Sequence, residues 1–316
     1  MTMPDGDFEA RLRESALEGA GVAVGAGAPG EALTSTMGAG GKRVRAGLVR
    51  SFGRLTGADP ARVEDVAMAV EFLHAATLVH DDLIDRAETR RGLPALHREH
   101  GPEVALLVGD LYVARCGVHL TRAASPRAAS ELWGALDTIV RGEIDQRGKR
   151  FDLAQAPDDY LATIRRKTAS LLAGASAAGA ILGEGTREQV EAARAYGDHL
   201  GVAFQLVDDV LDYRGSADEM GKPVGNDIRE GTVTLPLILA LGMSQAPVRA
   251  IVASARERDD FSAVVMAVRR SGALERCLAL AAEHSAAATS SLEAFDAGPE
   301  RDSLKELAES LLARQS

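Results

Sequence analysis

Two short aspartate clusters with identical spacing are the residues of this chain best suited to chemistry. Each reads D-D-x-x-D inside an apolar stretch, LHAATLVHDDLID or GVAFQLVDDVLDY. The six residues are Asp81, Asp82, Asp85, Asp208, Asp209 and Asp212. In a helix, positions three and four apart share a face, so each cluster presents its carboxylates on one side. Carboxylates beside apolar surface are costly unless they are paired or bound to a metal. Oxygen ligands suit hard cations, so we expect several Mg²⁺ ions; a solvated acidic helix face is the alternative for one cluster alone.

A second set of residues is basic and suits phosphate binding. The segment G-G-K-R-V-R at residues 40–45 is predicted to open a helix, whose N-terminus attracts anions. Arg90 and Arg91 follow the first aspartate cluster, and Lys167 and Lys222 lie further along the chain. Arginine forks match phosphate oxygens, so the basic residues together with Mg²⁺ indicate a bound diphosphate. A solvated basic helix start is the alternative for residues 40–45. The sequence contains no G-x-x-x-x-G-K-[ST] loop, which argues against a P-loop nucleotidase.

Composition excludes several other classes of protein. The chain has 316 residues and a net charge of −10, which argues against a nucleic-acid binder. Its two cysteines, Cys116 and Cys277, give no disulfide framework and suggest a reducing compartment. The N-terminus is acidic where a signal peptide would be basic and then apolar. The longest uncharged run, residues 168–183, is shorter than a membrane span. We therefore expect a cytoplasmic protein without an integral membrane segment.

Apolar periodicity predicts an all-α fold. Apolar residues recur at steps of three and four, as at Val63, Val66, Ala67 and Val70. Glycine and proline end these stretches, and few stretches alternate with a period of two. We expect a single bundle of about ten or more helices and no sheet over residues 31–316. Residues 1–30 are poor in apolar side chains and are expected to be loosely held.

Seven motifs in order make the chain resemble a known family. Besides the two aspartate clusters, they are G-G-K-R-x-R at residues 40–45, R-R-G at 90–92, K-T-A at 167–169, a loop beginning G-K at 221–231 and T-L-P at 234–236; the second cluster is preceded by F-Q at 204–205. The chain is similar to the trans-prenyltransferases, which are isoprenyl (polyprenyl) diphosphate synthases. The match runs from about residue 40 to residue 236.

The resemblance implies a fold and a reaction. The fold would be of the isoprenoid synthase type, with a deep central cavity and the two clusters facing each other across its mouth. The substrates would be isopentenyl diphosphate and an allylic diphosphate. Mg²⁺ held by the six aspartates would neutralise the leaving diphosphate. The double bond of isopentenyl diphosphate would attack the allylic cation, and the departing diphosphate would accept the last proton.

The resemblance also implies roles for individual residues. Isopentenyl diphosphate would be held by Lys42, Arg45, His74 and Arg91. The allylic diphosphate would be held by Arg90, Lys167 and Lys222. Lys167, Thr168 and Gln205 would serve catalysis, because the dipoles of the last two can face the cation. Glu143 and Gln146 either support this site or lie on the surface.

Two positions depart from the pattern of the family. Many relatives have proline after G-G-K-R-x-R, where this chain has Ala46. The family loop usually continues E-G-K, and here Thr232 occupies the place of the lysine. Because threonine carries no charge, we expect weaker binding or slower ionisation of the allylic diphosphate.

Product length is predicted from the helix that carries the first cluster. In relatives that stop at farnesyl or geranylgeranyl diphosphate, an aromatic residue one turn before the cluster often forms a floor. Here these positions are Ala76 and Thr77, and Leu73 lies one turn deeper. We therefore expect a product longer than geranylgeranyl diphosphate. The alternative is that Ala76 is small only to admit a neighbouring helix.

Other functions and an assembly state stay open at this level. The alternatives are a short-chain farnesyl or geranylgeranyl diphosphate synthase, a terpene cyclase of the same fold, and a subunit of a heteromeric synthase. The resemblance implies a homodimer, and the small residues from Ala169 to Gly183 suit close packing between subunits. Packing within one chain is an equally good explanation of that segment.

Overall fold

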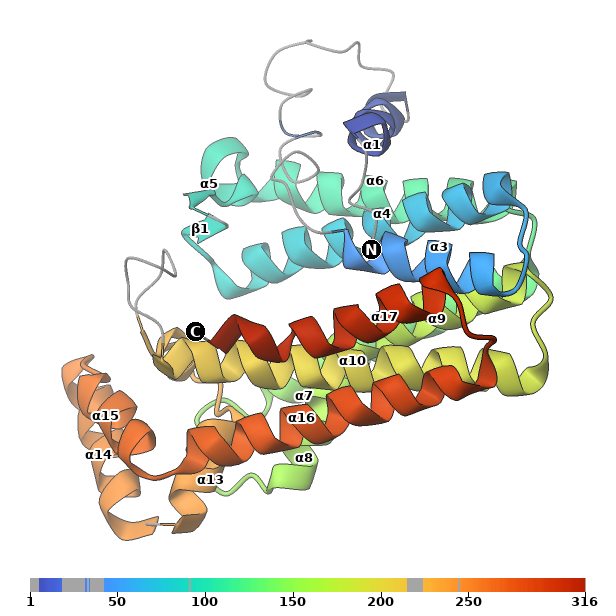
Figure 1. The fold of residues 1–316 in the computed structure, drawn as a ribbon. Helices are drawn as coiled ribbons and strands as arrows, with labels where there is room; N and C mark the ends of the chain where they lie inside the picture. Colours follow the sequence, from blue (N-terminus) through green and yellow to red (C-terminus); the bar gives the residue numbers. More distant parts are fainter. Residues whose placement is uncertain are drawn as a thin grey trace. The chain divides into compact units, whose positions relative to one another are not determined.

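The computed structural model describes residues 6–18, 32, 34, 43–90, 92–214, 224–243 and 245–315. Helices account for most of these residues, as Figure 1 shows, and the all-α prediction is confirmed. The chain divides into two compact units. One comprises Met1–Gly134 and Gly174–Ala193, and the other comprises Ala135–Ala173 and Arg194–Ser316.

The first unit is built around helix α4. Its elements are α1 (Gly6–Glu18), α3 (Val44–Leu55), α4 (Pro60–Asp85), β1 (Thr89–Arg90), β2 (Leu93–Pro94), α5 (Leu96–His100), α6 (Pro102–Arg122) and parts of α7 (Pro126–Arg147), α9 (Ser170–Leu182) and α10 (Arg187–Arg214). Helix α4 begins where the side chain of Asp59 accepts a hydrogen bond from Ala61 N, and Pro60 occupies its first turn. It ends at Arg86, whose backbone is left-handed.

Apolar packing holds α4 against α6. The ring of Phe72 is fully buried, and its centroid lies 5.8 Å from that of Tyr112. On the same side of α4, Asp65 Oδ1 lies 2.9 Å from Nδ1 of the buried His119. A helix that is apolar on most sides is a core helix, and α4 therefore provides a rigid base for the aspartates at its C-terminal end.

Two features of the first unit differ from expectation. Residues 6–18, expected to be loosely held, form α1, in which Phe8, Leu12 and Ala16 are fully buried. These residues are four apart and make an apolar stripe, which the low overall apolar content of the segment conceals. The second difference is a short antiparallel pair of strands, β1 and β2, where no sheet was expected. Gly92 lies in its turn with a φ of +78°.

The small-residue segment near α9 packs within the chain. In the first unit, a Cβ at Gly179 would lie 2.5 Å from the backbone oxygen of Val49. In the second unit, a Cβ at Gly201 would overlap Ala169. The side chains from Leu171 to Leu182 are buried throughout. The structure thus supports the intrachain explanation of this segment, and any contact between subunits must use another surface.

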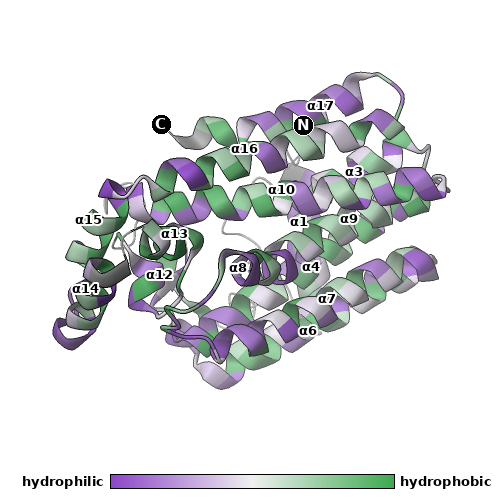
Figure 2. Cartoon of the chain, turned by 90° about the horizontal axis from the view of Figure 1, so that it is seen from below, coloured by the Kyte–Doolittle hydropathy of each residue, from purple (hydrophilic) through white to green (hydrophobic). Residues whose placement is uncertain are grey.

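The second unit has a separate apolar core. Besides parts of α7, α9 and α10, its elements are α8 (Pro157–Ile164), the π-helix η1 (Arg165–Ala169), α12 (Asn226–Arg229), α13 (Leu235–Met243), α14 (Gln245–Arg258), α15 (Ser262–Arg270), α16 (Ala273–Ser291), η2 (Leu292–Ala294), α17 (Pro299–Ser310) and η3 (Leu312–Gln315). Helix α13 is mostly green in Figure 2, and its side chains join those of α10 and α16 in this core. The hydroxyl of Tyr196 donates to Leu304 O at 2.7 Å and ties α10 to α17.

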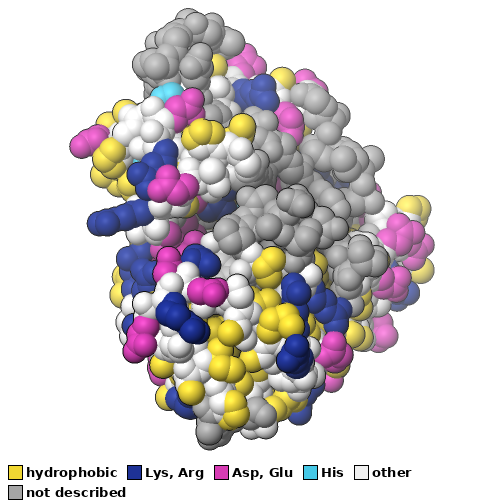
Figure 3. Space-filling model, turned by 90° about the vertical axis from the view of Figure 1, so that its left-hand side faces the viewer, with side chains coloured by type: hydrophobic (Ala, Val, Ile, Leu, Met, Phe, Trp, Pro, Cys, Tyr) yellow, Lys and Arg dark blue, Asp and Glu magenta, His cyan; other side chains and the backbone are white. Residues whose placement is uncertain are grey.

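Charged side chains of both signs are mixed on the face drawn in Figure 3. Within the second unit, Arg214 Nη2 lies 2.7 Å from Glu275 Oε1, and Arg229 Nη1 lies 3.1 Å from Asp259 Oδ1. Exposed pairs of this kind contribute about 0–1 kcal/mol each. Stability must therefore come mainly from the buried apolar residues of each unit.

Close contact between α10 and η1 gives a stability prediction. Gly201→Ala should lower the free energy of unfolding by about 1–3 kcal/mol, because the added methyl group overlaps Ala169. Gly134→Ala is the control, since a Cβ on this residue of α7 meets no described atom within 4 Å. It should be neutral or stabilise the protein by up to about 1 kcal/mol. Urea unfolding would measure both, and equal effects would contradict the close contact.

Candidate active site

The first aspartate cluster lies in the last turns of α4. Asp82 is 5% exposed, and Arg90 of β1 donates from Nε to both of its carboxylate oxygens, at 2.9 and 3.0 Å. Arg90 Nη2 also donates to Asp82. By contrast, Asp81 is half-buried and Asp85 is exposed. The short β1–β2 hairpin therefore serves to place Arg90 over Asp82, and the two neighbouring carboxylates lie nearer to solvent.

The second cluster also combines buried and exposed carboxylates, but two of its three aspartates are buried. Asp208 is exposed, whereas Asp209 and Asp212 are each 1% exposed. Asp209 accepts hydrogen bonds from Gln205 Nε2 at 2.9 Å and from the hydroxyl of Tyr160. Burial raises the pKa of Asp209 to about 7, with hydrogen bonds from Gln205 and Tyr160 acting in the opposite direction.

Asp212 has a backbone role. Its two carboxylate oxygens accept from Asn226 N at 3.2 Å and Asp227 N at 3.3 Å, at the start of α12. A carboxylate at this position satisfies backbone N–H groups that have no partner within the helix. Asp212 therefore holds the start of α12 next to the end of α10.

A metal would be held by the carboxylates that reach solvent. Among the described residues, no group of three or more His, Cys, Asp or Glu side chains is gathered closely enough to enclose a cation. The carboxylates of the two clusters that reach solvent are those of Asp81 and Asp85 in the first unit and of Asp208 in the second. Such hard oxygen donors fit Mg²⁺, which usually binds through a few carboxylates together with phosphate oxygens and water. The metal-ligand role itself stays a prediction.

Lys167 and Thr168 lie on the π-helix η1, and π-helices occur often at functional sites. Lys167 Nζ is 2.6 Å from Glu143 Oε2 and donates to Gln146 Oε1 at 3.1 Å. Glu143 and Gln146 are thus half-buried and hold the ammonium group of Lys167. Thr168 Oγ1 donates to Gln205 Oε1 at 2.8 Å, which brings two predicted catalytic residues together.

The basic segment at the start of α3 is only partly described. Arg43, with a φ of +44°, precedes the helix, and its Nη1 lies 3.2 Å from Oε2 of the buried Glu71. Glu71 Oε1 also accepts from Ala46 N at 3.2 Å. Proline at position 46 would have no N–H to donate, so alanine adds a hydrogen bond here. Arg45 lies in the first turn of α3 and is half-buried.

Three predicted diphosphate-binding residues, Lys42, Arg91 and Lys222, lie outside the described residues. Of the residues assigned to isopentenyl diphosphate, Arg45 and His74 are described. His74 is half-buried on α4 and lies seven residues before Asp81. Residues seven apart on a helix share a face, so His74 and Asp81 lie on one side of α4.

Comparison with known proteins identifies the family of the chain. Residues 30–268 match the family described as polyprenyl synthetase. The chain is 36% identical over 282 residues to heptaprenyl diphosphate synthase component 2 of Geobacillus stearothermophilus, covering 88% of each chain. It is 34% identical over 284 residues to a short chain isoprenyl diphosphate synthase of Methanothermobacter thermautotrophicus, covering 88% of this chain and 87% of the relative. A crystal structure of a decaprenyl diphosphate synthase from Rhodobacter capsulatus superposes with a TM-score of 0.89, at 33% identity, over 98% and 95% of the two chains.

The chain belongs to the polyprenyl synthetase family. It is therefore a prenyltransferase, and the family resemblance of the sequence is confirmed. The relatives named above have products of different lengths, so family membership does not by itself give the product of this synthetase.

The residues predicted to control product length lie on different faces of α4. Ala76 is 1% exposed and is four residues from both Phe72 and His80. Phe72 packs on Tyr112 of α6, and His80 lies against Gly109 of the same helix. Ala76 thus lies on the α4 face that packs on α6. Its small size is explained by the alternative given above, in which a small residue admits a neighbouring helix.

Thr77 lies on another face of α4. It is four residues before Asp81, so the two share a helix face, and its side chain is half-buried. Thr77 Oγ1 donates to His74 O at 2.8 Å. Leu73, by contrast, is fully buried. Among these positions, Thr77 is therefore the one whose face leads directly to the aspartate cluster.

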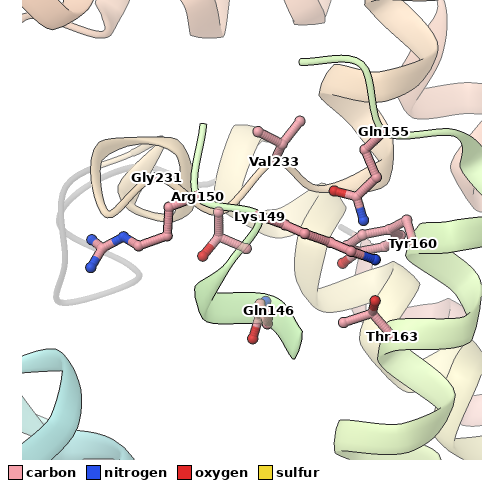
Figure 4. A pocket seen from close by; sticks show the side chains of 9 residues that line it. Gln146, Lys149, Arg150, Gln155, Tyr160, Thr163, Gly231 and Val233 are labelled. Atoms are coloured by element: carbon pink, nitrogen blue, oxygen red, sulfur yellow. The ribbon is translucent and has the colours of Figure 1, made fainter. Parts of the chain in front are cut away.

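A small polar pocket borders Thr232, the residue that replaces the lysine usual in this family. Figure 4 shows its lining, in which Lys149 points toward Tyr160 and Gln155. Its volume is about 20 Å³, which is room for about one water molecule. The lining includes the cations Lys149 and Arg150 and no carboxylate. A cation from the segment after α7 thus lies in the same pocket as the uncharged Thr232.

Two buried groups of the site were missed by sequence reasoning. Glu71 could have been noticed, because a lone acid in the apolar stretch MAVEFLH requires a partner when it is buried. Tyr160 carries no comparable signal. It lies 49 residues before its partner Asp209, and only the packing of α8 beside α10 brings them together.

Proposed function

We propose that this polyprenyl synthetase condenses isopentenyl diphosphate with an allylic diphosphate, in a Mg²⁺-dependent reaction, to an all-trans product longer than geranylgeranyl diphosphate. We place it in the cytoplasm. The observation that carries the proposal is the pair of aspartate clusters in the family's motifs, each with at least one solvent-facing carboxylate beside a buried one.

The aspartates that face solvent would bind the metal. Mg²⁺ held by Asp81, Asp85 and Asp208 would neutralise the charge that develops on the departing diphosphate. Lys167 would contact the same diphosphate, and its ammonium is kept in place by Glu143 and Gln146. Arg90 would contribute once a diphosphate competes with Asp82 for its guanidinium.

Other residues would act on the second substrate and on the cation. Lys42, Arg45, His74 and Arg91 would hold isopentenyl diphosphate, and Lys222 would join Lys167 and Arg90 on the allylic diphosphate. The oxygen dipoles of Thr168 and Gln205 would stabilise the allylic cation. A terpene cyclase needs no second diphosphate site, so the cations at residues 42–45 support a condensing enzyme.

The proposal predicts that prenyl transfer depends on the metal. Asp81→Ala and Asp208→Ala should each lower turnover by several orders of magnitude, because a lost ligand displaces a metal. The assay uses labelled isopentenyl diphosphate, farnesyl diphosphate and Mg²⁺, and circular dichroism checks the helices. Asp137→Ala is the control, since this carboxylate is exposed on α7 and pairs with Arg141.

The same assay separates the alternatives. Label in longer chains supports the proposal, and cyclic hydrocarbon from the wild type would indicate a cyclase. Activity only after a second protein is added would indicate a heteromeric synthase, as the name "component 2" of one relative suggests. Near-normal turnover in both aspartate variants would contradict their assignment as ligands.

Product length is proposed from the small residues one turn before the first cluster. A chain that grows along α4 from the diphosphate passes Thr77 after about 6 Å, at 1.5 Å per residue. The names of relatives with long products agree, among them a solanesyl-diphosphate synthase of Oryza sativa that is 34% identical over 290 residues, covering 90% of this chain and 72% of the relative.

Substitutions on the two faces of α4 test this proposal. Thr77→Phe should shorten the product, because its ring extends from the face shared with Asp81. Ala76→Tyr should instead destabilise the fold by about 1–3 kcal/mol, because Ala76 is buried on the face toward α6. Chromatography of the products and thermal unfolding measure the two effects. An unchanged product with Thr77→Phe, or a wild-type product no longer than geranylgeranyl diphosphate, would show that Thr77 does not border the path.

An apolar stripe on α6 supports the proposal of a homodimer. Val104, Leu107 and Val118 are 37, 66 and 38% exposed, and they repeat at helical spacing along one face. Trp133 of α7 is 38% exposed, and its ring lies next to Gly117 of α6. Among the described helices, α6 is the one that is long and apolar enough to cross a membrane, but 44% of its most apolar stretch is buried within the chain. A second copy would cover the remainder.

Leu107→Asp should convert the dimer to a monomer, because it places a charge in the middle of the stripe. Met266→Asp is the matched control on α15, where the side chain is 43% exposed. Light scattering at working concentration gives the mass of each. A wild-type monomer, or a Leu107→Asp dimer, would count against this surface.

A further inference from the structure

Four side chains of the second unit form one continuous chain of hydrogen bonds. Thr168 Oγ1 donates to Gln205 Oε1 at 2.8 Å, and Gln205 Nε2 donates to Asp209 Oδ1 at 2.9 Å. The hydroxyl of Tyr160 donates to Asp209 Oδ2. The chain thus runs from η1 to α10 and ends on α8, with Asp209 as the acceptor for both of its arms.

Asp209 sets the direction of every bond in this chain, because both of its oxygens accept, one from Gln205 Nε2 and the other from the hydroxyl of Tyr160. The amide of Gln205 therefore turns its N–H₂ toward Asp209. Its oxygen then faces Thr168, which must donate its single hydroxyl proton to it. The lone pairs of Thr168 Oγ1 are consequently directed away from Gln205, with the negative end of the hydroxyl dipole available to a cation.

Burial and hydrogen bonding also separate Asp209 from a metal. Asp209 is 1% exposed, and each of its oxygens accepts from a described side chain, whereas the adjacent Asp208 is exposed. One lone pair of each Asp209 oxygen is already occupied, and the small exposed fraction of the side chain leaves a metal little access to the others. Two consecutive aspartates of one motif therefore occupy opposite environments.

Backbone packing keeps this arrangement in place. Gly197, Gly201, Gln205 and Asp209 are each four residues apart and lie on one face of α10. A Cβ at Gly197 would overlap the backbone of Leu172, and one at Gly201 would overlap Ala169. The two glycines thus bring α10 close to α9 and η1, so that the side chain of Gln205 reaches both Thr168 and Asp209.

We propose that Asp209 is a positioning residue and not a metal ligand: it orients Gln205 so that Thr168 presents its oxygen lone pairs to the allylic cation. This inference rests on the proposed prenyl transfer. An oriented dipole stabilises a developing charge without reorganising during the reaction, and it acts on the transition state more than on the bound substrates.

The experiment compares two neighbouring isosteric substitutions. Asp209→Asn should keep the affinity for Mn²⁺ in the presence of inorganic diphosphate within about 2-fold, and should keep KM for both substrates, while kcat falls by about 100-fold. Asp208→Asn should weaken Mn²⁺ binding by at least about 10-fold, because it removes a charged ligand. Calorimetry gives the metal affinity, and steady-state kinetics give the split between kcat and KM.

A double substitution tests the direction of the hydrogen bonds. In Asp209→Asn/Gln205→Glu, Tyr160 can donate to the amide oxygen at position 209, whose N–H₂ donates to the carboxylate at position 205. Thr168 must then again donate its proton, and the number of charges is unchanged. We expect kcat to recover by about 10-fold relative to Asp209→Asn. The double variant also serves if the single variant fails to fold, because it keeps all the hydrogen bonds.

The outcomes are distinct. Equal losses of Mn²⁺ affinity in Asp208→Asn and Asp209→Asn would overturn the proposal and make Asp209 a ligand. An unchanged kcat in Asp209→Asn, or a double variant with no more activity than Asp209→Asn, would overturn the positioning role. Wild-type protein that transfers no prenyl group would instead refute the proposed function, and the Mn²⁺ comparison would still show whether Asp209 binds metal.

Discussion

The cost of burying a carboxylate organises the active-site side chains of this protein. Asp82, Asp209 and Glu71 are each at most 5% exposed, and each accepts a hydrogen bond from a side chain of another segment. The donors are Arg90 of β1, Tyr160 of α8, and Arg43 before α3. An unpaired buried charge would cost several kcal/mol, so these contacts cannot loosen independently of the fold. The residues nearest the proposed substrates are therefore fixed by acids that do not themselves reach solvent.

These contacts depend on helices that approach closely. Within the second unit, glycines four residues apart on α10 leave room for the backbone of η1 and α9. A larger residue at either position would push the helices apart, and hydrogen bonds of 2.8 to 2.9 Å between Thr168, Gln205 and Asp209 would be lost. The small residues thus contribute to the site by allowing the helices to pack closely, and not through functional groups of their own. The same segment first suggested a contact between subunits, but its side chains are buried within the chain.

Sequence reasoning succeeded where a short pattern has one physical meaning. Helical periodicity predicted the all-α fold, and the order of the motifs predicted the family. It failed where the partner lies far away in the chain, as with Tyr160 and Asp209, because no local pattern records which helices pack together. It also failed for α1, whose four-residue apolar stripe is hidden by low average apolar content. The hairpin that carries Arg90 was too short to give a strand pattern.

The two aspartate motifs have the same sequence pattern, but within each motif the carboxylates lie in different environments. Each contains a residue that contacts solvent, Asp85 or Asp208, and a buried residue that accepts from neighbouring side chains, Asp82 or Asp209. Helix geometry contributes to this division at Asp208 and Asp209, because adjacent residues point about 100° apart around the axis, so one faces solvent while the other faces the core. A carboxylate that binds metal must stay accessible, whereas one that orients a dipole must be desolvated to act strongly. One D-D pair on a half-buried helix supplies both environments, which gives a physical reason for aspartate at two consecutive positions.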